Sequence, residues 1–322
     1  MNYQTFLDEI LEVVKEKVEQ GCKVYMNPVL KNNGLERDAI VILKEGENIS
    51  PNIYLDYYFD RYCDGESLDE IGDEIIIVYN EAILEKPIST ENYLNFNHYQ
   101  DSIFYRVVHF EKNEQLLQEI PHIRYLDLAI TFHCMVNENQ KGIQSYCISQ
   151  RVLEYWGITK EELYQLAMKN TPFLFPPQIS TMENLLFHLE TNGENSFCVA
   201  SEKKTQVICS MEEYEQYLEE MMEEFSLETE FPIYVISNQN GVNGAATILY
   251  PELLQKFAEK CNSSFYLLPS SIHEILVIPE QEGKKEELKQ MVYEVNNTHV
   301  AKDEILSYSV YYYDWNKREL CL

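Results

Sequence analysis

Apolar residues in the first third of the chain recur first at helical and then at alternating spacing. Helical spacing over residues 3–20, followed by Gly21, predicts an opening helix. Two apolar runs, 22–30 and 37–44, predict strands, and Asn32-Asn33-Gly34 between them predicts the tight turn of a hairpin. Beyond them the pattern predicts a short strand after Pro51, a helix over 67–84 with a Ser67/Glu70 capping box, and a strand at 103–110.

The middle of the chain combines long extended runs with amphipathic helices. The run 125–136 predicts a strand paired with 143–148, and Thr159 with Glu162 predicts a capped helix that ends near Asn170. The pattern then predicts a helix at 180–190, a hairpin of 196–200 with 205–209, and a helix at 211–225.

The last segment of the chain has a regular order of elements. The pattern predicts a strand at 232–237, a helix at 251–261, strands at 264–268 and 272–279, a helix at 284–297 and a strand at 306–313. This β-α-β-β-α-β order is typical of the ferredoxin-like fold, and a further strand at 245–250 would alter it. We expect an α+β protein with mixed or antiparallel sheets and packed helices, in three regions: 1–118, 119–229 and 230–322.

The net charge of the chain limits the kinds of partner that we expect it to bind. There are 54 acidic and 25 basic residues, a formal net charge of −29. Such a charge repels nucleic-acid phosphates and anionic lipids, so we expect neither direct nucleic-acid binding nor a membrane partner. It suits a basic protein partner, or mimicry of a nucleic acid, although acidic surfaces also simply confer solubility. Glutamates crowd the 211–225 helix without calcium-loop spacing, so we predict no metal site.

Cysteines and the N-terminus indicate the compartment. The eight cysteines are scattered singly, with no Cys-x-x-Cys pair, and we expect most of them to be reduced and buried. The first residues lack the basic and apolar regions of a signal peptide, and no run approaches the roughly 20 apolar residues of a membrane helix. We therefore expect a cytoplasmic protein.

Two places in the last region offer candidate chemistry. His273 and Glu274 precede the apolar run 275–278 and point to opposite faces of a strand, so one of them is expected to be buried with a partner or a shifted pKa. They are the candidate catalytic residues, and a strand-end pair satisfied by loop amides is the alternative. The candidate ligand-binding residues are Asn240, Gly241, Asn243 and Gly244. Their loop can offer backbone N–H groups to an anion, or glycine can simply supply the turn.

Short stretches spread along the chain carry a resemblance. They are Asn48-Ile49-Ser50-Pro51, Pro121-His122, Leu249-Tyr250-Pro251 and Leu268-Pro269-Ser270-Ser271-Ile272-His273-Glu274. Together they resemble an uncharacterised family, a domain of unknown function from gut clostridia. The resemblance covers nearly the whole chain. It implies one architectural unit and no established activity.

Motifs of known enzymes are missing from the sequence. We find no nucleophile elbow, zinc-ligand spacing or nucleotide-binding glycine motif, and we predict no cofactor. These absences favour a non-enzymatic cytoplasmic protein that binds a partner through an acidic, tyrosine-rich surface. The alternatives are a nucleic-acid mimic and an enzyme whose site lies near residues 238–245 with His273 and Glu274. Convergence of those residues on one pocket would favour the enzyme.

Overall fold

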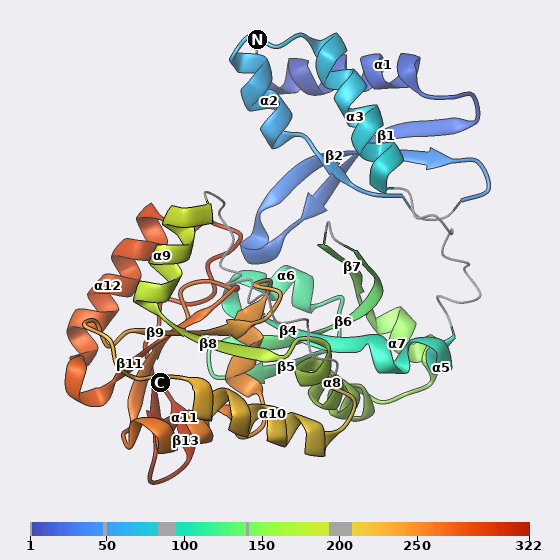
Figure 1. Ribbon diagram of the computed structural model, residues 1–322. Helices are drawn as coiled ribbons and strands as arrows, with labels where there is room; N and C mark the ends of the chain where they lie inside the picture. Colours follow the sequence, from blue (N-terminus) through green and yellow to red (C-terminus); the bar gives the residue numbers. More distant parts are fainter. Residues whose placement is uncertain (1, 48–49, 83–94, 140–141, 193–207) are drawn as a thin grey trace. The chain divides into compact units, whose positions relative to one another are not determined.

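The computed structural model describes residues 2–47, 50–82, 95–139, 142–192 and 208–322. The chain forms two compact units, Met1–Phe96 and Asn97–Leu322 (Figure 1). Within the described ranges, antiparallel sheets of three, six and four strands pack against helices, which confirms the predicted α+β class. The hairpin predicted at 196–200 and 205–209 lies almost entirely outside the described residues.

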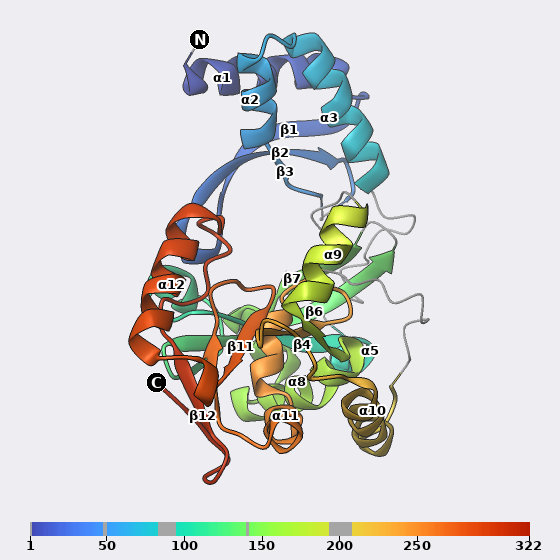
Figure 2. The same cartoon turned by 60° about the vertical axis from the view of Figure 1, so that its left-hand side comes forward.

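The N-terminal unit is a three-stranded antiparallel sheet with helices packed on it (Figure 2). Its elements are α1 (Tyr3–Lys17), β1 (Cys22–Leu30), β2 (Glu36–Lys44), β3 (Ile53–Tyr54), α2 (Asp56–Cys63) and α3 (Leu68–Ala82). Phe6 of α1, Ile40 of β2 and Ile75 of α3 are fully buried in one core. Asn33 and Gly34 take left-handed backbone angles and close the β1–β2 hairpin, as predicted.

The C-terminal unit begins with a four-stranded sheet. Its elements are α5 (Phe96–Tyr99), β4 (Ile103–His109), α6 (Glu114–Leu117), β5 (His122–Tyr125), β6 (Leu128–Asn139), β7 (Gly142–Cys147), α7 (Gln150–Trp156) and α8 (Lys160–Leu174). β6 pairs with β4 along one edge and with β5 and β7 along the other. The run predicted as one strand from 125 is interrupted by Leu126, whose φ is 56°. α8 is anchored on β4, because Asn170 donates to the Ile103 carbonyl at 3.0 Å.

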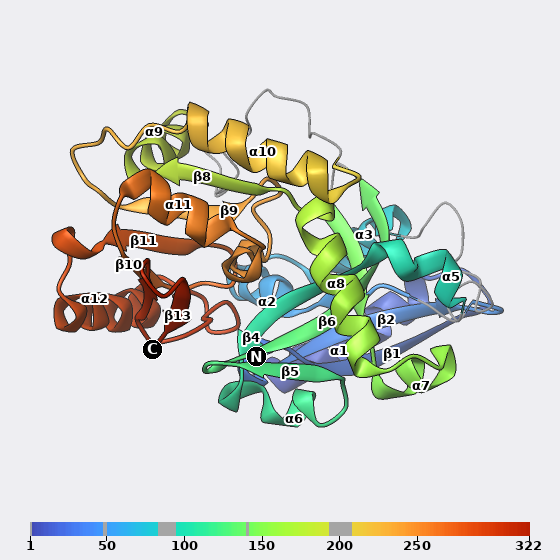
Figure 3. The ribbon, with the colours of Figure 1, turned by 90° about the horizontal axis from the view of Figure 1, so that it is seen from below.

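A six-stranded sheet follows, in the order β13-β12-β10-β11-β9-β8. Its elements are β8 (Pro177–Thr181), α9 (Met182–Asn192), α10 (Met211–Glu224), β9 (Tyr234–Asn238), α11 (Leu253–Cys261), β10 (Phe265–Leu268), β11 (Ile275–Pro279), α12 (Lys285–Thr298), β12 (Tyr311–Asp314) and β13 (Glu319–Cys321). Figure 3 shows β8, β9, β11 and β10 side by side in this order.

The β-α-β-β-α-β order is present, but its strand pairing is not ferredoxin-like. β11 lies between β9 and β10, yet β12 pairs with β10, whereas the last strand of a ferredoxin-like fold pairs with the first. β8 already occupies the edge of β9 that β12 would need. Phe257 of α11 packs on Phe265, whereas Leu288 of α12 packs with Leu268. Since these two strand residues face opposite ways, the helices cover opposite faces and the ferredoxin-like prediction is wrong.

The sheets also cross the region boundaries that we expected. β4 precedes residue 118 and shares a sheet with β5, β6 and β7, which follow it. β8 precedes residue 229 and pairs with β9 beyond it. The predicted regions 1–118, 119–229 and 230–322 therefore do not coincide with the two compact units.

Asp127 ties the two sheets of the C-terminal unit together. Its carboxylate accepts hydrogen bonds from the hydroxyls of Ser307 at 2.6 Å, Ser309 at 2.9 Å and Tyr311. A carboxylate with three donors is well satisfied, so this contact fixes the turn before β6 to the segment that leads into β12.

The cysteines and the helices bear on the predicted compartment. The described cysteines are free thiols, but only Cys134 among them is buried, and Cys63, Cys209 and Cys321 are exposed, so the prediction that most cysteines are buried is wrong. None of the helices within the described ranges is both long and apolar enough to cross a membrane.

Candidate functional site

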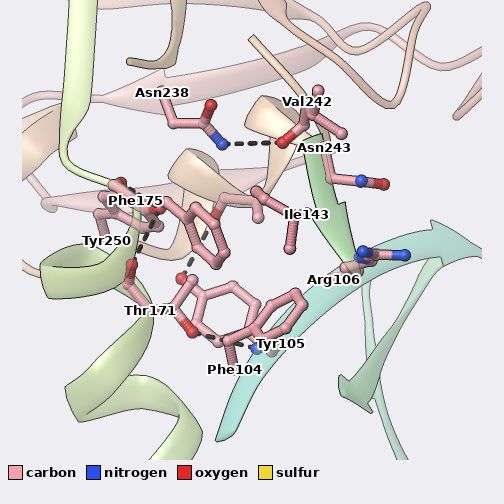
Figure 4. Close-up of a pocket in the computed structure, with 11 residues that line it drawn as sticks. Phe104, Tyr105, Arg106, Ile143, Thr171, Phe175, Asn238, Val242, Asn243 and Tyr250 are labelled. Carbon is pink, nitrogen blue, oxygen red and sulfur yellow. Dashed lines mark hydrogen bonds between the residues drawn. The ribbon is translucent and has the colours of Figure 1, made fainter. Parts of the chain in front are cut away.

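A small, partly open cleft with room for little more than one water-sized molecule lies within the C-terminal unit (Figure 4). It is lined by Phe104, Tyr105 and Arg106 of β4, Ile143 of β7, Thr171 and Phe175 at the end of α8, and Asn238, Val242, Asn243, Ala246 and Tyr250 from the end of β9 and the segment after it. The cleft therefore joins two strands of the four-stranded sheet, the end of α8, and the end of β9 with the segment after it, which are far apart in sequence.

Arg106 is the charged residue of this cleft. One of its terminal nitrogens, Nη2, donates to the Ser145 hydroxyl at 2.9 Å, and its guanidinium carbon lies 5.2 Å from the centre of the Phe104 ring. Its Nε is buried and has no hydrogen-bond acceptor. Burial lowers the pKa of Arg106 to about 10, so it stays protonated at neutral pH. Among the described residues, no carboxylate forms an ion pair with it.

The titratable neighbours of Arg106 are uncharged at neutral pH. Burial and the charge of Arg106 hold the pKa of His133 well below its usual value. The neutral His133 ring lies 3.0 Å from the Thr131 hydroxyl and stacks on Phe104. Burial raises the pKa of the Cys147 thiol to about 11. The face of β4, β6 and β7 at this cleft thus carries one positive charge.

Most of the other polar groups of the cleft are already paired. Tyr105 donates to the Ala246 carbonyl at 3.1 Å, Tyr250 to the Phe175 carbonyl at 2.8 Å, Thr171 to the Ala167 carbonyl at 2.6 Å and Asn238 to the Val242 carbonyl at 2.9 Å. The two tyrosines consequently present their rings to the cleft. Within the described ranges the Asn243 side chain has no such bond, and Figure 4 shows it on the same side of the cleft as Arg106.

The candidate ligand-binding loop lines the cleft with a side chain, whereas the sequence predicted that its backbone N–H groups would face a ligand. Of its four residues, Asn243 lines the cleft. Its backbone donors are largely used within the protein, since Gly241 donates to the Asn238 carbonyl and Asn243 to Nδ1 of His273, at 3.1 and 3.3 Å. Gly241 has a φ of 64°, which explains that glycine as a turn residue. The loop backbone is therefore poorly suited to hold an anion, and Asn240 lies in the turn beside it.

His273 and Glu274 support the loop from behind and do not line the cleft. His273 accepts from the Asn243 backbone, and its Nε2 lies 3.5 Å from a carboxylate oxygen of Glu304. Glu274 is 9% exposed, and its Oε2 has no hydrogen-bond partner. Burial raises the pKa of Glu274 to about 7. The structure thus brings His273 to the loop, as the enzyme hypothesis requires, but neither His273 nor Glu274 lines this cleft.

The raised pKa of Glu274 predicts how stability changes with pH. The folded-state pKa of about 7 lies above the unfolded value of 4.5, so stability is lost as pH rises through this window. Between pH 5 and pH 6.5 the wild type should lose about 2 kcal/mol of unfolding free energy relative to Glu274→Gln. This value follows from about 1.36 kcal/mol per pH unit for one proton. Urea unfolding at both pH values measures it, and exposed Glu215→Gln is the control. A difference that does not grow with pH would contradict the burial of Glu274.

Comparison with known proteins shows which family the chain belongs to. A family model described as a family of unknown function, DUF5688, matches residues 3–315. The chain belongs to that family. No curated protein and no solved structure matches the chain. The predicted resemblance to an uncharacterised family is confirmed, and the family carries no activity over to the cleft.

Sequence reasoning missed Arg106, although a signal for it exists. The strand Ile103-Phe104-Tyr105-Arg106-Val107-Val108 is apolar except for one arginine. Arginine is almost never fully buried unless it is paired, so a lone arginine in such a strand is unusual. No group of three or more His, Cys, Asp or Glu side chains in the described part of the chain is arranged to hold a metal ion.

Proposed function

We propose that the C-terminal unit binds a small anionic molecule in the cleft around Arg106. The observation that carries this proposal is a half-buried, protonated guanidinium whose buried Nε has no acceptor and which has no carboxylate partner among the described residues. Removing a charge from water without a counter-charge costs several kcal/mol. The chain has 54 acidic residues, yet none of the described ones is paired with Arg106.

Proteins keep an unpaired, partly desolvated charge mainly at functional sites, because there a ligand supplies the missing counter-charge. The cleft is small, and its lining is mostly apolar with few polar groups. Binding rather than catalysis is the function that this supports best. The titratable neighbours of Arg106 are neutral, and the candidate catalytic residues His273 and Glu274 do not line the cleft.

Titration calorimetry of the full chain against acetate, benzoate, sulfate and inorganic phosphate tests the proposal. At least one of these anions should bind the wild type and should bind Arg106→Gln at least about tenfold more weakly, as expected for the loss of a charge-assisted hydrogen bond. Arg151→Gln, which removes an exposed arginine of the same unit, should bind like the wild type. Binding of none of the four anions, or equal binding by Arg106→Gln, would overturn the proposal.

Binding of a basic protein through the acidic helices remains a prediction from the sequence. On α10, Glu212, Glu213, Glu215, Glu219, Glu220, Glu223 and Glu224 are exposed. Lys256 of α11 lies 3.3 Å from Glu219. This face is on helices that do not line the cleft, so the two binding functions are independent and can be tested separately.

A further inference from the structure

One short segment before β11 holds the loop that follows β9. This segment, residues 270–274, is called the strap. It accepts hydrogen bonds from two backbone N–H groups of the loop. Asn243 donates to Nδ1 of His273 at 3.3 Å, and Ala245 donates to the Ile272 carbonyl at 3.1 Å. The position of the loop therefore depends on whether the strap stays in place.

Glu274 is the residue of the strap whose charge can change the stability of this arrangement. Its side chain is 9% exposed, and one carboxyl oxygen, Oε2, has no hydrogen-bond partner among the described residues. The Ser271 hydroxyl donates to the carboxyl, whereas the negative charge of Glu304 opposes its ionisation. A buried carboxylate with so few donors is costly, but the same carboxylate in water is fully solvated. Ionisation therefore favours a state in which Glu274 reaches water.

Among the described residues around Glu274, none supplies a cation that would keep it ionised in place. By alternation it shares a face with Leu276, which packs with α12, and the buried residues of α12 are uncharged: Leu288, Val292 and Asn296. The register of β9 places Ser237 beside it. Glu304, from the segment before β12, is the charged group that acts on it. His273 points to the opposite face, and its Nε2 lies 3.5 Å from a carboxylate oxygen of Glu304.

We propose that residues 270–274 form a pH-sensitive switch: when Glu274 loses its proton, the strap opens and releases the loop that carries Asn243. Burial raises the pKa of Glu274 to about 7, above its value of 4.5 in water, so the closed strap is favoured in acid and is lost as the pH rises through neutrality. Asn243, whose φ is 53°, then loses the contact that holds its left-handed backbone. The switch does not depend on the proposed function, because no ligand takes part in it.

Hydrogen exchange of the full chain tests the switch at the amides of Asn243 and Ala245, which donate to the strap. Protection is the intrinsic exchange rate divided by the measured one. From pH 5 to pH 7 it should fall at least about tenfold more in the wild type than in Glu274→Gln, which cannot ionise. Both proteins keep His273, so its titration cancels in this comparison. Glu280→Gln, which removes an exposed carboxylate, should behave like the wild type. Amides of β6 report unfolding of the whole unit and should be at least about tenfold better protected.

Three results would overturn the switch. If the amides of Asn243 and Ala245 are as well protected as those of β6 at both pH values, they exchange only when the whole unit unfolds, and the strap does not open by itself. If their protection falls equally in the wild type and in Glu274→Gln, opening of the loop does not expose this carboxyl. If Glu280→Gln removes the fall as fully as Glu274→Gln does, the acidic charge of the chain, and not the buried carboxyl, is responsible.

Discussion

Replacing Arg106 with methionine should make the protein more stable while it removes anion binding. In the absence of ligand, the half-buried guanidinium of Arg106 has a single described hydrogen bond and no carboxylate partner in the described residues. Replacing buried ionic groups by apolar side chains of similar size is often stabilising by about 1–4 kcal/mol. We expect the free energy of unfolding of Arg106→Met to exceed that of the wild type by about 2 kcal/mol, because methionine fills the space without needing a counter-charge.

Urea unfolding followed by tryptophan fluorescence measures this difference in the relevant unit. The two tryptophans of the chain, Trp156 and Trp315, both belong to Asn97–Leu322, so the signal reports the C-terminal unit. Arg151→Met is the matched control, because Arg151 is exposed and surface substitutions usually stay within about 0.5 kcal/mol. A loss of more than about 1 kcal/mol in Arg106→Met would mean that the guanidinium has a structural role. The case for an open anion site would then lose its basis.

Gly244→Ala should be among the most destabilising single-methyl additions to the C-terminal unit. A Cβ at this position would overlap the Ser237 hydroxyl and the His273 carbonyl oxygen, and it would lie 2.9 Å from the backbone nitrogen of Asn238. Two of these atoms belong to the backbone and cannot turn away as a flexible side chain can. Overpacking of this kind costs about 3 kcal/mol. The loop that carries Asn243 would also shift, so benzoate binding should weaken together with stability.

Gly157→Ala provides the comparison for this variant. Gly157 has a left-handed φ of 68°, but a Cβ there meets no atom within 4 Å. Its substitution therefore measures the cost of the backbone conformation alone, which is about 1 kcal/mol. The same fluorescence measurement applies to both variants. If Gly244→Ala is no more destabilising than Gly157→Ala, the close approach between the 238–246 loop and His273 does not exist in solution.

Local signals in the sequence predicted local structure well. The capping box of α3 is present, since Ser67 and Glu70 exchange side-chain and backbone hydrogen bonds of 3.2 and 3.3 Å. Thr159 and Glu162 do the same at the start of α8. These contacts span three residues, so the sequence contains everything that forms them. The Asn33-Gly34 turn belongs to the same group, because it depends on which residues tolerate left-handed angles.

Elements whose conformation depends on distant partners were missed. α2 was not predicted, because its run of tyrosines and phenylalanine favours strands locally. Phe59 in it packs against Phe6 of α1, with ring centres 5.3 Å apart, and this contact lies outside any local window. β8 was missed for a similar reason, and its last two residues were placed in the helix predicted at 180–190. Its place in the sheet depends on β9, more than fifty residues later, and β8 in turn prevents a ferredoxin-like pairing.

The sequence by itself determined the α+β class, the hairpin, the capped helices and a charge of −29, because these follow from composition and from contacts between near neighbours. It also contained an arginine in an apolar strand. Only the tertiary structure decided that this arginine lies half-buried beside Phe104, in the same cleft as Asn243, and without a carboxylate among the described residues. The physical reason is that desolvation and ion pairing depend on every segment that folds around a charge. Here those segments come from β4, β7, α8 and the loop after β9.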